Sequence, residues 1–344
     1  MKLCERLGIE LPIIQAPMAG AQGSMLTIAV SNAGGLGSLP CAMLSAEALA
    51  AELKEIRGST DKPYNLNFFC HQQPQPDEAR EQAWRDRLGA YYAEYGIDAR
   101  AIQTGAGRAP FSAELADLIE PYRPPVISFH FGLPAPELVE RIKGWGTLVF
   151  SSATTVEEAL WLEQHGADAI IAQGLEAGGH RGMFLSDDLT TQVGTFALLP
   201  QIVQAVSCPV IAAGGIADAQ GVAAALSLGA QAVQLGTAYL CCPETKISAI
   251  HRAALQSEAA RHTALTNIFS GRPARGIVNR AIHELGPICT DAPAFPLAST
   301  AITPLRSVAE KQGSGDFSPL WAGQNASQCR EIPAAELTRL LSDS

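Results

Sequence analysis

The sequence has no concentration of positive charge and no long apolar segment. It contains 24 Lys and Arg residues against 34 Asp and Glu residues, so its formal net charge is −10 at pH 7. Without a basic cluster there is no face for the phosphate backbone of a nucleic acid, and we expect no nucleic-acid partner. No apolar run approaches the ~20 residues that span a bilayer, and the N-terminal segment lacks a cleavable signal pattern. We therefore expect a cytoplasmic protein that binds no membrane.

Two further patterns are absent. The eight cysteines are scattered, apart from the adjacent pair Cys241 and Cys242, and they have no metal-site spacing. We expect free thiols in a reducing compartment and no bound metal. No GxGxxG motif opens a strand–helix unit near the N-terminus, which argues against a tightly held dinucleotide.

What the chain does have is a large apolar content in short runs. Of its 344 residues, 47% are hydrophobic and 17% are charged, enough for one large domain with an insertion or for two domains. Near-continuous apolar runs are typical of parallel strands that are covered on both faces. Eight such runs are expected to be strands: 13–18, 36–40, 65–69, 126–131, 147–151, 169–173, 209–213 and 232–236.

Amphipathic segments separate these runs. The expected helices span 25–32, 45–57, 112–119, 136–143, 155–165, 196–206 and 218–228. Eight strand–helix alternations predict an α/β fold, a (β/α)8 TIM barrel, in preference to an open doubly wound sheet. In such a barrel the active site lies at the C-terminal ends of the strands.

Two regions do not fit the simple repeat. Residues 70–111 are too long for a strand–helix loop and are expected to form a helix over 78–95 and a loop over the barrel mouth. Residues 244–300 indicate helices over 246–260 and 270–284. We therefore predict a barrel of residues 1–240 and 302–344, with a smaller, mostly helical substrate domain at 241–301 inserted after the eighth strand. The last barrel helix is expected over 302–325, followed by a polar, peripheral tail.

The ends of the seventh and eighth expected strands are rich in glycine. Gly214 and Gly215 follow the seventh, and Gln234-Leu235-Gly236-Thr237 ends the eighth. In barrels the loops after these strands commonly bind a phosphate, and a helix beginning near Asp218 would add its positive dipole. Either motif alone is explained by a tight turn. Both together favour a phosphate-bearing mononucleotide such as FMN.

Polar side chains end several other strands. Residues 173–182 read QGLEAGGHRG, directly after a strand, and supply Gln173, Gly178 and His180. Gln173 and Asn67, on the third expected strand, carry amides that can both donate and accept, as the edge of a flavin ring requires. His130 ends the fourth strand. Each histidine alone could be structural, but two at strand ends that face one cofactor favour a functional role.

Several motifs together resemble the nitronate monooxygenase (2-nitropropane dioxygenase) family. They are QAPMAG (15–20), SNAGGLGSLP (31–40), SFHFG (128–132), QGLEAGGHRG (173–182), AAGGIAD (212–218), QLGTAYL (234–240) and FSGRPARGIVNR (269–280). SFHFG marks the class I subgroup. The resemblance implies FMN bound in a barrel, with His130 and His180 as catalytic residues. The positions that match the family's FMN contacts are Asn67, Gln173, Gly178, Gly215, Gln234, Leu235, Gly236 and Thr237.

The reaction that the resemblance implies is oxidation of an alkyl nitronate by O2 through an anionic flavin semiquinone. Propionate 3-nitronate is the expected substrate, and the role is detoxification. Enoyl-ACP reductase II and flavin-dependent NAD(P)H:quinone reductases have similar SNAGGLG, GGH and AGGIAD motifs and remain the alternative, as does a non-catalytic FMN-binding barrel. The partner of a substrate carboxylate stays open among Arg181, Lys246, Arg272, Arg275 and Arg306. We expect a monomer or a homodimer.

Overall fold

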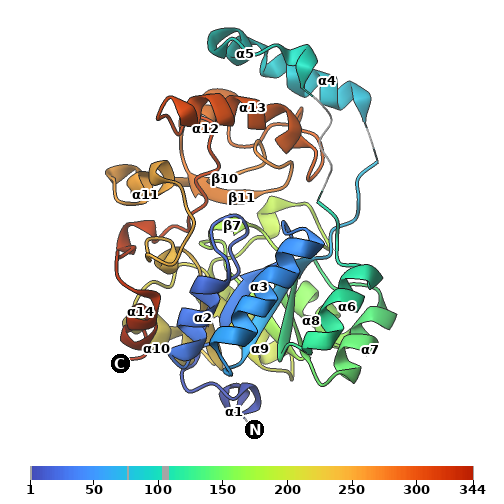
Figure 1. Cartoon of the computed structure of the whole chain (residues 1–344), viewed down its shortest axis with the longest axis vertical. Helices are drawn as coiled ribbons and strands as arrows, with labels where there is room; N and C mark the ends of the chain where they lie inside the picture. Colours follow the sequence, from blue (N-terminus) through green and yellow to red (C-terminus); the bar gives the residue numbers. More distant parts are fainter. Residues whose placement is uncertain (1, 76, 103–107, 344) are drawn as a thin grey trace.

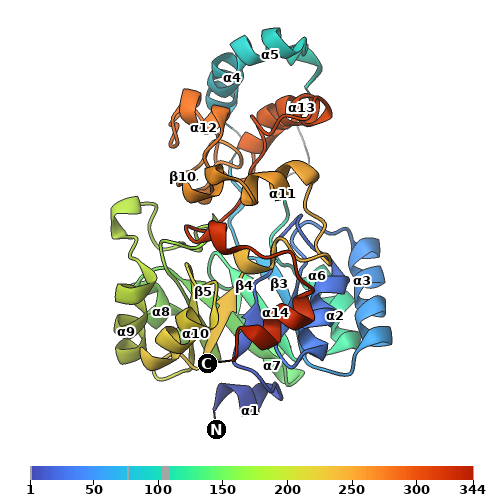
Figure 2. The same cartoon turned by 90° about the vertical axis from the view of Figure 1, so that its left-hand side faces the viewer.

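A computed structural model of the chain describes residues 2–75, 77–102 and 108–343. The molecule is elongated, with a barrel at one end and a smaller cap at the other (Figures 1 and 2). The N-terminus and the C-terminus both lie on the barrel part. A cavity lies where the barrel meets the cap.

Eight parallel strands form the barrel, in agreement with the predicted fold class. Their order around the sheet is β1-β9-β8-β6-β5-β4-β3-β2. A parallel bridge between Ile14 and Leu36 joins the first strand to the last and closes the sheet. All eight expected strands are confirmed: β1 (Ile13–Gln15), β2 (Gly37–Pro40), β3 (Tyr64–Phe69), β4 (Val126–His130), β5 (Leu148–Ala153), β6 (Ala169–Gln173), β8 (Val210–Ala213) and β9 (Ala232–Leu235).

Helices surround the barrel where the amphipathic segments predict them. Several of them begin at side-chain caps, among them Ser45, Thr155 and Asp218, whose oxygens accept a backbone N–H of the first turn. An apolar cluster fills the barrel interior, and the short helix α1 (Leu3–Leu7) adds Leu3 and Leu7 to it. The surrounding helices are α2 (Ser24–Asn32), α3 (Ala46–Ser59), α6 (Ala113–Ile119), α7 (Pro136–Gly144), α8 (Val156–Gln164), α9 (Thr195–Ala205) and α10 (Ala219–Ser227).

The last helix of the barrel is not the predicted one. Helix α14 (Ala334–Leu340) packs against α2, and the Tyr239 hydroxyl lies 2.9 Å from the Thr338 hydroxyl. Leu337 and Leu341 are buried in the barrel's outer core. The expectation of a peripheral tail is therefore wrong, because this segment covers the apolar surface that 302–325 was expected to cover.

Helix α13 (Ala298–Lys311) lies in the cap instead. It packs on α4 (Glu78–Arg87) and α5 (Gly89–Tyr95), the two helices that replace the single expected helix over 78–95. The Trp84 indole N–H donates to the Ala298 carbonyl at 3.1 Å, and the Tyr92 hydroxyl donates to the Ala301 carbonyl at 2.7 Å. This packing joins 78–95 and 298–311 to the cap, although the predicted boundaries separated them. Part of the loop expected over the barrel mouth, 103–107, lies outside the described residues.

The cap also contains a small sheet that the sequence analysis did not predict. Strand β11 (Ala274–Ile277) pairs antiparallel with β10 (Thr263–Thr266) and with β7 (Gly179–His180). The expected helix over 270–284 is wrong, because Gly271, Pro273 and Gly276 disfavour a helix there. Only α12 (Arg280–Leu285) is helical in that range, and α11 (Ala249–Leu255) with a short 3-10 turn (Glu258–Arg261) occupies 246–260.

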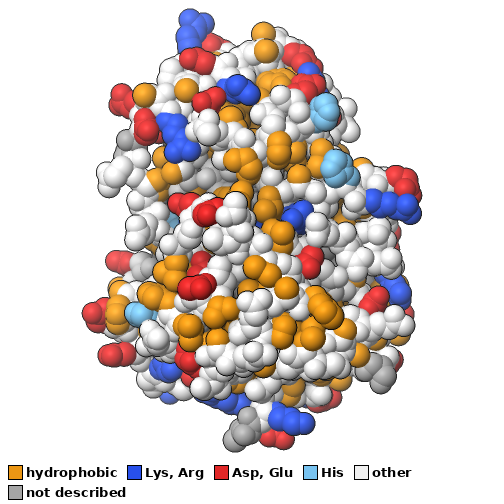
Figure 3. Space-filling view, turned by 180° about the vertical axis from the view of Figure 1, so that it is seen from behind, with side chains coloured by type: hydrophobic (Ala, Val, Ile, Leu, Met, Phe, Trp, Pro, Cys, Tyr) orange, Lys and Arg blue, Asp and Glu red, His pale blue; other side chains and the backbone are white. Residues whose placement is uncertain are grey.

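The surface agrees with the charge pattern of the sequence. On the face shown in Figure 3, Lys and Arg side chains are scattered among Asp and Glu side chains. Within the described residues, the helices are all too short or too polar to cross a bilayer.

Candidate active site

A cavity opens at the C-terminal ends of the barrel strands, under the cap. The ten site residues predicted from the sequence all line it, although they come from five strands and from the three segments that follow β6, β8 and β9. They are Asn67, His130, Gln173, Gly178, His180, Gly215, Gln234, Leu235, Gly236 and Thr237. Their individual roles stay predictions. Within 2–75, 77–102 and 108–343, the His, Cys, Asp and Glu side chains form no group of three that could hold a metal ion.

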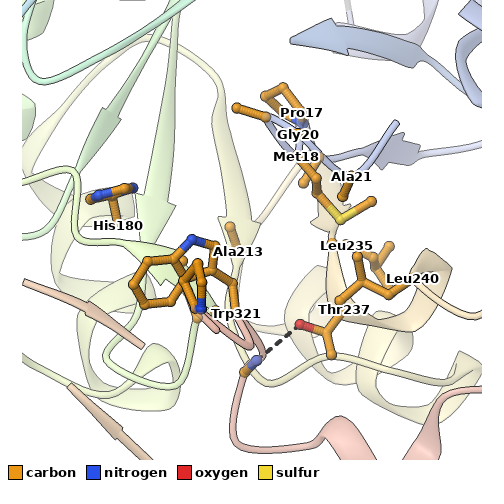
Figure 4. A pocket seen from close by; sticks show the side chains of 18 of the residues that line it. Pro17, Met18, Gly20, Ala21, His180, Ala213, Leu235, Thr237, Leu240 and Trp321 are labelled. Carbon is orange, nitrogen blue, oxygen red and sulfur yellow. Dashed lines mark hydrogen bonds between the residues drawn. The ribbon is translucent and has the colours of Figure 1, made fainter. Parts of the chain in front are cut away.

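The glycine loops after β8 and β9 give the cavity a wall of bare backbone. Gly214 has φ 122° and Gly215 has φ 73°, a region of backbone conformation that favours glycine. A Cβ on Gly214 would lie 2.8 Å from the Thr195 hydroxyl. The Thr237 hydroxyl accepts the Gly323 N–H at 2.9 Å and keeps its own proton to donate (Figure 4). This end of the cavity can therefore receive a group that is rich in acceptor oxygens.

The loop after β6 is anchored at three points. Arg181 is fully buried and donates to the carbonyls of Gly174 and Gln173 at 2.6 and 2.7 Å. Glu176 accepts the Thr195 N–H at 2.8 Å, so it anchors the loop to the start of α9. The Gln173 amide donates to the His180 carbonyl at 2.9 Å and accepts the Gly182 N–H at 2.7 Å. The Gln173 amide therefore uses one N–H and its carbonyl oxygen to hold the loop.

Residues 318–321, Gly323 and Asn325 also line the cavity, and the sequence analysis missed them. Trp321 lies beside His180, with ring centres 5.6 Å apart, and both lie across the cavity from Pro17 and Met18 (Figure 4). The Asn325 amide donates to the Gly215 carbonyl at 3.0 Å. A Cβ on Gly178 would lie 2.5 Å from the Gly323 nitrogen, so glycine lets the two segments touch. The Gly and Asn residues of 313–325 were a signal against the helix predicted there.

His130 is hydrogen-bonded through both ring nitrogens. Its Nε2 lies 3.1 Å from the His180 carbonyl and its Nδ1 lies 3.1 Å from the Ser152 hydroxyl. Since a carbonyl only accepts, Nε2 carries the proton and Nδ1 accepts from Ser152. Burial, with the charges of Arg272 and Arg181, lowers the pKa of His130 to about 4. His130 is therefore a neutral imidazole that holds the backbone of His180.

His180 presents a different pattern. Its Nε2 lies 2.8 Å from the Ser270 hydroxyl, and the pairing of β7 with β11 fixes its backbone. Phe295 and Trp321 flank the ring. Burial, with the nearby charge of Arg108, lowers the pKa of His180 well below its usual range. Its Nδ1 makes no hydrogen bond within the described part of the chain, so this atom is available to a ligand.

Two amides keep unused groups in the cavity. Asn67 donates through its Nδ2 to the carbonyl and the hydroxyl of Ser128 at 3.1 and 3.0 Å, which leaves its Oδ1 as a free acceptor among the described residues. The Gln234 side chain makes no hydrogen bond with any residue that the structure describes. These groups suit the polar edge of a flat heterocycle.

Comparisons with known proteins agree on one family. A family model described as "Nitronate monooxygenase" matches residues 1–343. The chain is 45% identical to the nitronate monooxygenase of Pseudomonas aeruginosa over 97% of this chain and 96% of the relative. It is also 45% identical to that of Paraburkholderia phytofirmans, over 97% of this chain and 92% of the relative.

Solved structures with the same fold cover nearly the whole chain. A nitroalkane oxidase from Streptomyces ansochromogenes superposes with a TM-score of 0.89 at 40% identity, covering 98% of this chain and 96% of the other. FabK from Thermotoga maritima superposes with a TM-score of 0.73 at 28% identity, covering 98% and 94%. From its full-length match and its closely similar relatives, the chain belongs to the nitronate monooxygenase family of oxidoreductases.

Proposed function

We propose that the protein is an FMN-dependent monooxygenase that oxidises alkyl nitronates, with propionate 3-nitronate as the physiological substrate and detoxification as the role. The observation that carries this proposal is His180, a neutral imidazole with a free Nδ1. It lies in one cavity with a bare glycine wall at the ends of β8 and β9.

The residues present fit FMN. The loops at Gly214-Gly215 and Gly236-Thr237 offer backbone N–H groups and a hydroxyl to a phosphate, next to the N-terminus of α10. Asn67 Oδ1 and the Gln234 amide suit the acceptors and donors of the flavin pyrimidine edge. Gly178 would provide backbone beside the flavin, while Gln173 would contribute its remaining amide proton. When bound, FMN would supply the redox chemistry between the nitronate and O2.

His180 is the residue that we expect to contact the substrate. The Ser270 hydroxyl donates to the Arg272 carbonyl at 3.3 Å, so in this geometry it accepts from Nε2–H and leaves an unprotonated Nδ1. If the hydroxyl turns to donate to Nε2 instead, Nδ1 carries the proton. The first form can remove the α-proton of a neutral nitroalkane. The second can donate a hydrogen bond to the nitro oxygens of an anionic nitronate. Because the pKa of His180 is well below its usual range, either form is neutral at pH 7.

His130 acts as a positioning residue in this account. Its Nε2–H holds the His180 carbonyl, and its Nδ1 is held by Ser152. Next to it, Phe131 has φ 71°, a conformation that costs about 1–3 kcal/mol in a residue with a side chain. Strain of this size at the end of β4 is consistent with a wall that is shaped for function.

A second candidate is an FMN reductase that uses NAD(P)H to reduce a quinone or an enoyl thioester. The structural similarity to FabK favours it. The higher identity and TM-score of the nitroalkane oxidase favour nitronate oxidation.

The test compares oxygen consumption by the purified flavoprotein with propionate 3-nitronate, primary alkyl nitronates and NADH. We expect fast consumption with nitronates and slow consumption with NADH. In His180→Asn, kcat/KM should fall by about 100-fold or more with nitroalkanes, because a general base contributes 10²–10⁴-fold. It should fall less with nitronates, which need no proton removed. Unchanged kcat/KM with both substrates would rule out this role for His180.

A further inference from the structure

Two cationic side chains line the cavity, and they differ in whether they are paired. Among the described residues, the Lys and Arg side chains that line it are Arg108 and Arg306. Arg306 donates through its Nε to the Glu310 carboxylate at 2.8 Å, so a partner already balances its charge. In the described part of the chain, Arg108 forms no ion pair and its guanidinium makes no hydrogen bond.

The other cations considered from the sequence are engaged elsewhere. Arg181 is buried against backbone carbonyls, and Arg275 donates to the Leu175 carbonyl at 3.0 Å. Lys246 pairs with Glu52 at 3.1 Å. Arg272 donates to the Met183 carbonyl and stacks on Phe131, with its Cζ 4.2 Å from the ring centre. Each of these side chains already has a structural task.

The backbone of Arg108 is held by hydrogen bonds, while its guanidinium has no hydrogen-bond partner among the described residues. Its carbonyl accepts from the His71 ring at 2.9 Å and from the Gln73 amide at 2.8 Å. Its guanidinium lies over the Phe295 ring, 5.5 Å from the ring centre, and Phe295 also packs against His180. Burial lowers the pKa of the Arg108 guanidinium, yet arginine stays charged at neutral pH. A partly desolvated, unpaired cation in a cavity favours an anionic ligand.

We propose that Arg108 binds a carboxylate at the far end of the nitronate substrate and so makes the enzyme selective for nitronates that carry a second negative charge. The inference rests on the proposed function. In the described part of the chain the histidines that line the cavity are His130, His180 and His251, and the lowered pKa of each leaves it neutral at pH 7. They therefore supply no positive charge for this group. A guanidinium can receive a carboxylate through two parallel hydrogen bonds, which fixes orientation as well as charge.

The test measures kcat/KM with propionate 3-nitronate and with butyl-1-nitronate, an uncharged-chain nitronate of similar length. Arg108→Gln should lower kcat/KM for propionate 3-nitronate by about 10- to 100-fold, mainly through KM, because a hydrogen bond to a charged group contributes about 1.5–3 kcal/mol. The value for butyl-1-nitronate should change by less than about 3-fold. Arg108→Lys, which keeps the charge, should recover part of the loss. Arg306→Gln is the matched comparison, because Arg306 lines the same cavity but is paired.

The outcomes separate this inference from the proposed function. Equal loss on both substrates in Arg108→Gln, no loss on either, or a selective loss in Arg306→Gln alone would overturn the assignment to Arg108 while nitronate oxidation stands. If the wild-type enzyme oxidises neither nitronate, the proposed function fails, and the carboxylate site fails with it.

Discussion

The neutral state of His130 makes a prediction about how stability depends on pH. In the fold the pKa of His130 is about 4, because the ring is buried and lies near Arg272 and Arg181. In the unfolded chain it returns to about 6.5. The unfolded state therefore binds a proton between these values while the folded state does not. The contribution of this histidine to stability is complete above about pH 6.5 and is lost as pH falls towards 4.

The magnitude follows from the two pKa values. When the pH falls from about 7.5 to about 5, the titration of His130 should lower the free energy of unfolding by about 2 kcal/mol. His130→Asn removes this titrating group. Over the same pH range, the free energy of unfolding of the variant should therefore fall by about 2 kcal/mol less than that of the wild type. At neutral pH the variant should be less stable, because the hydrogen bonds to Ser152 and to the His180 carbonyl are altered.

The assay is urea unfolding of both proteins at several pH values, compared as a difference so that carboxylates common to both cancel. His130→Gln serves as a second variant in case the first folds poorly. A difference in unfolding free energy that stays constant from pH 7.5 to pH 5 would refute the reasoning, since His130 would then titrate alike in the folded and unfolded chains.

Three further predictions concern packing. Gly178→Ala places a Cβ 2.5 Å from the Gly323 nitrogen, and such overpacking costs about 1–3 kcal/mol. The variant should therefore bind FMN about 10-fold more weakly, or worse, in a fluorescence titration. Gly58→Ala is the control, because Gly58 has open space around it, and it should leave FMN binding unchanged. Leu337→Ala should lower the free energy of unfolding, measured in urea, by about 2–5 kcal/mol, because the Leu337 side chain is only 3% exposed. Leu340→Ala in the same helix should lower it by under about 1 kcal/mol, because Leu340 is 40% exposed. Equal effects of these two substitutions would mean that α14 is peripheral after all. Trp84→Ala removes a buried indole between α4 and α13 and should lower the free energy of unfolding by about 3–5 kcal/mol. A decrease below about 1 kcal/mol would contradict the packing of α4 on α13 in the cap.

The barrel could be predicted because each strand carries its own local signal. Runs such as 209–213 are apolar on both faces, and the intervening segments have helical periodicity. The glycine and histidine positions follow from the strand ends, since parallel strands bring those ends together. The fold and the cavity residues at the strand ends were therefore accessible without knowledge of long-range contacts.

The cap could not be predicted in the same way. Strand β7 has two residues, and its pairing with β11 joins His180 to Ala274, a contact that no local pattern encodes. The apolar face of α13 has the same spacing whether it packs on the barrel or on α4 and α5. The α14 signal was present, since Ala334, Leu337, Thr338 and Leu341 follow the i, i+3, i+4, i+7 spacing of a buried helical face.

Arg108 shows what a sequence cannot reveal about a single charge. In the sequence it is one arginine among many, next to a glycine-rich segment. Its significance depends on which other cations have partners, and those partners lie far away along the chain. Arg306 and Glu310 are the exception, because their i, i+4 spacing predicts a pair on one helix.

The most direct test of the central claim is anaerobic mixing of the purified yellow protein with propionate 3-nitronate or with NADH, followed by flavin absorbance. The account predicts rapid loss of the oxidised flavin spectrum with the nitronate and little change with NADH over the same time. Rapid reduction by NADH with none by the nitronate would contradict it and would assign the protein to the reductases.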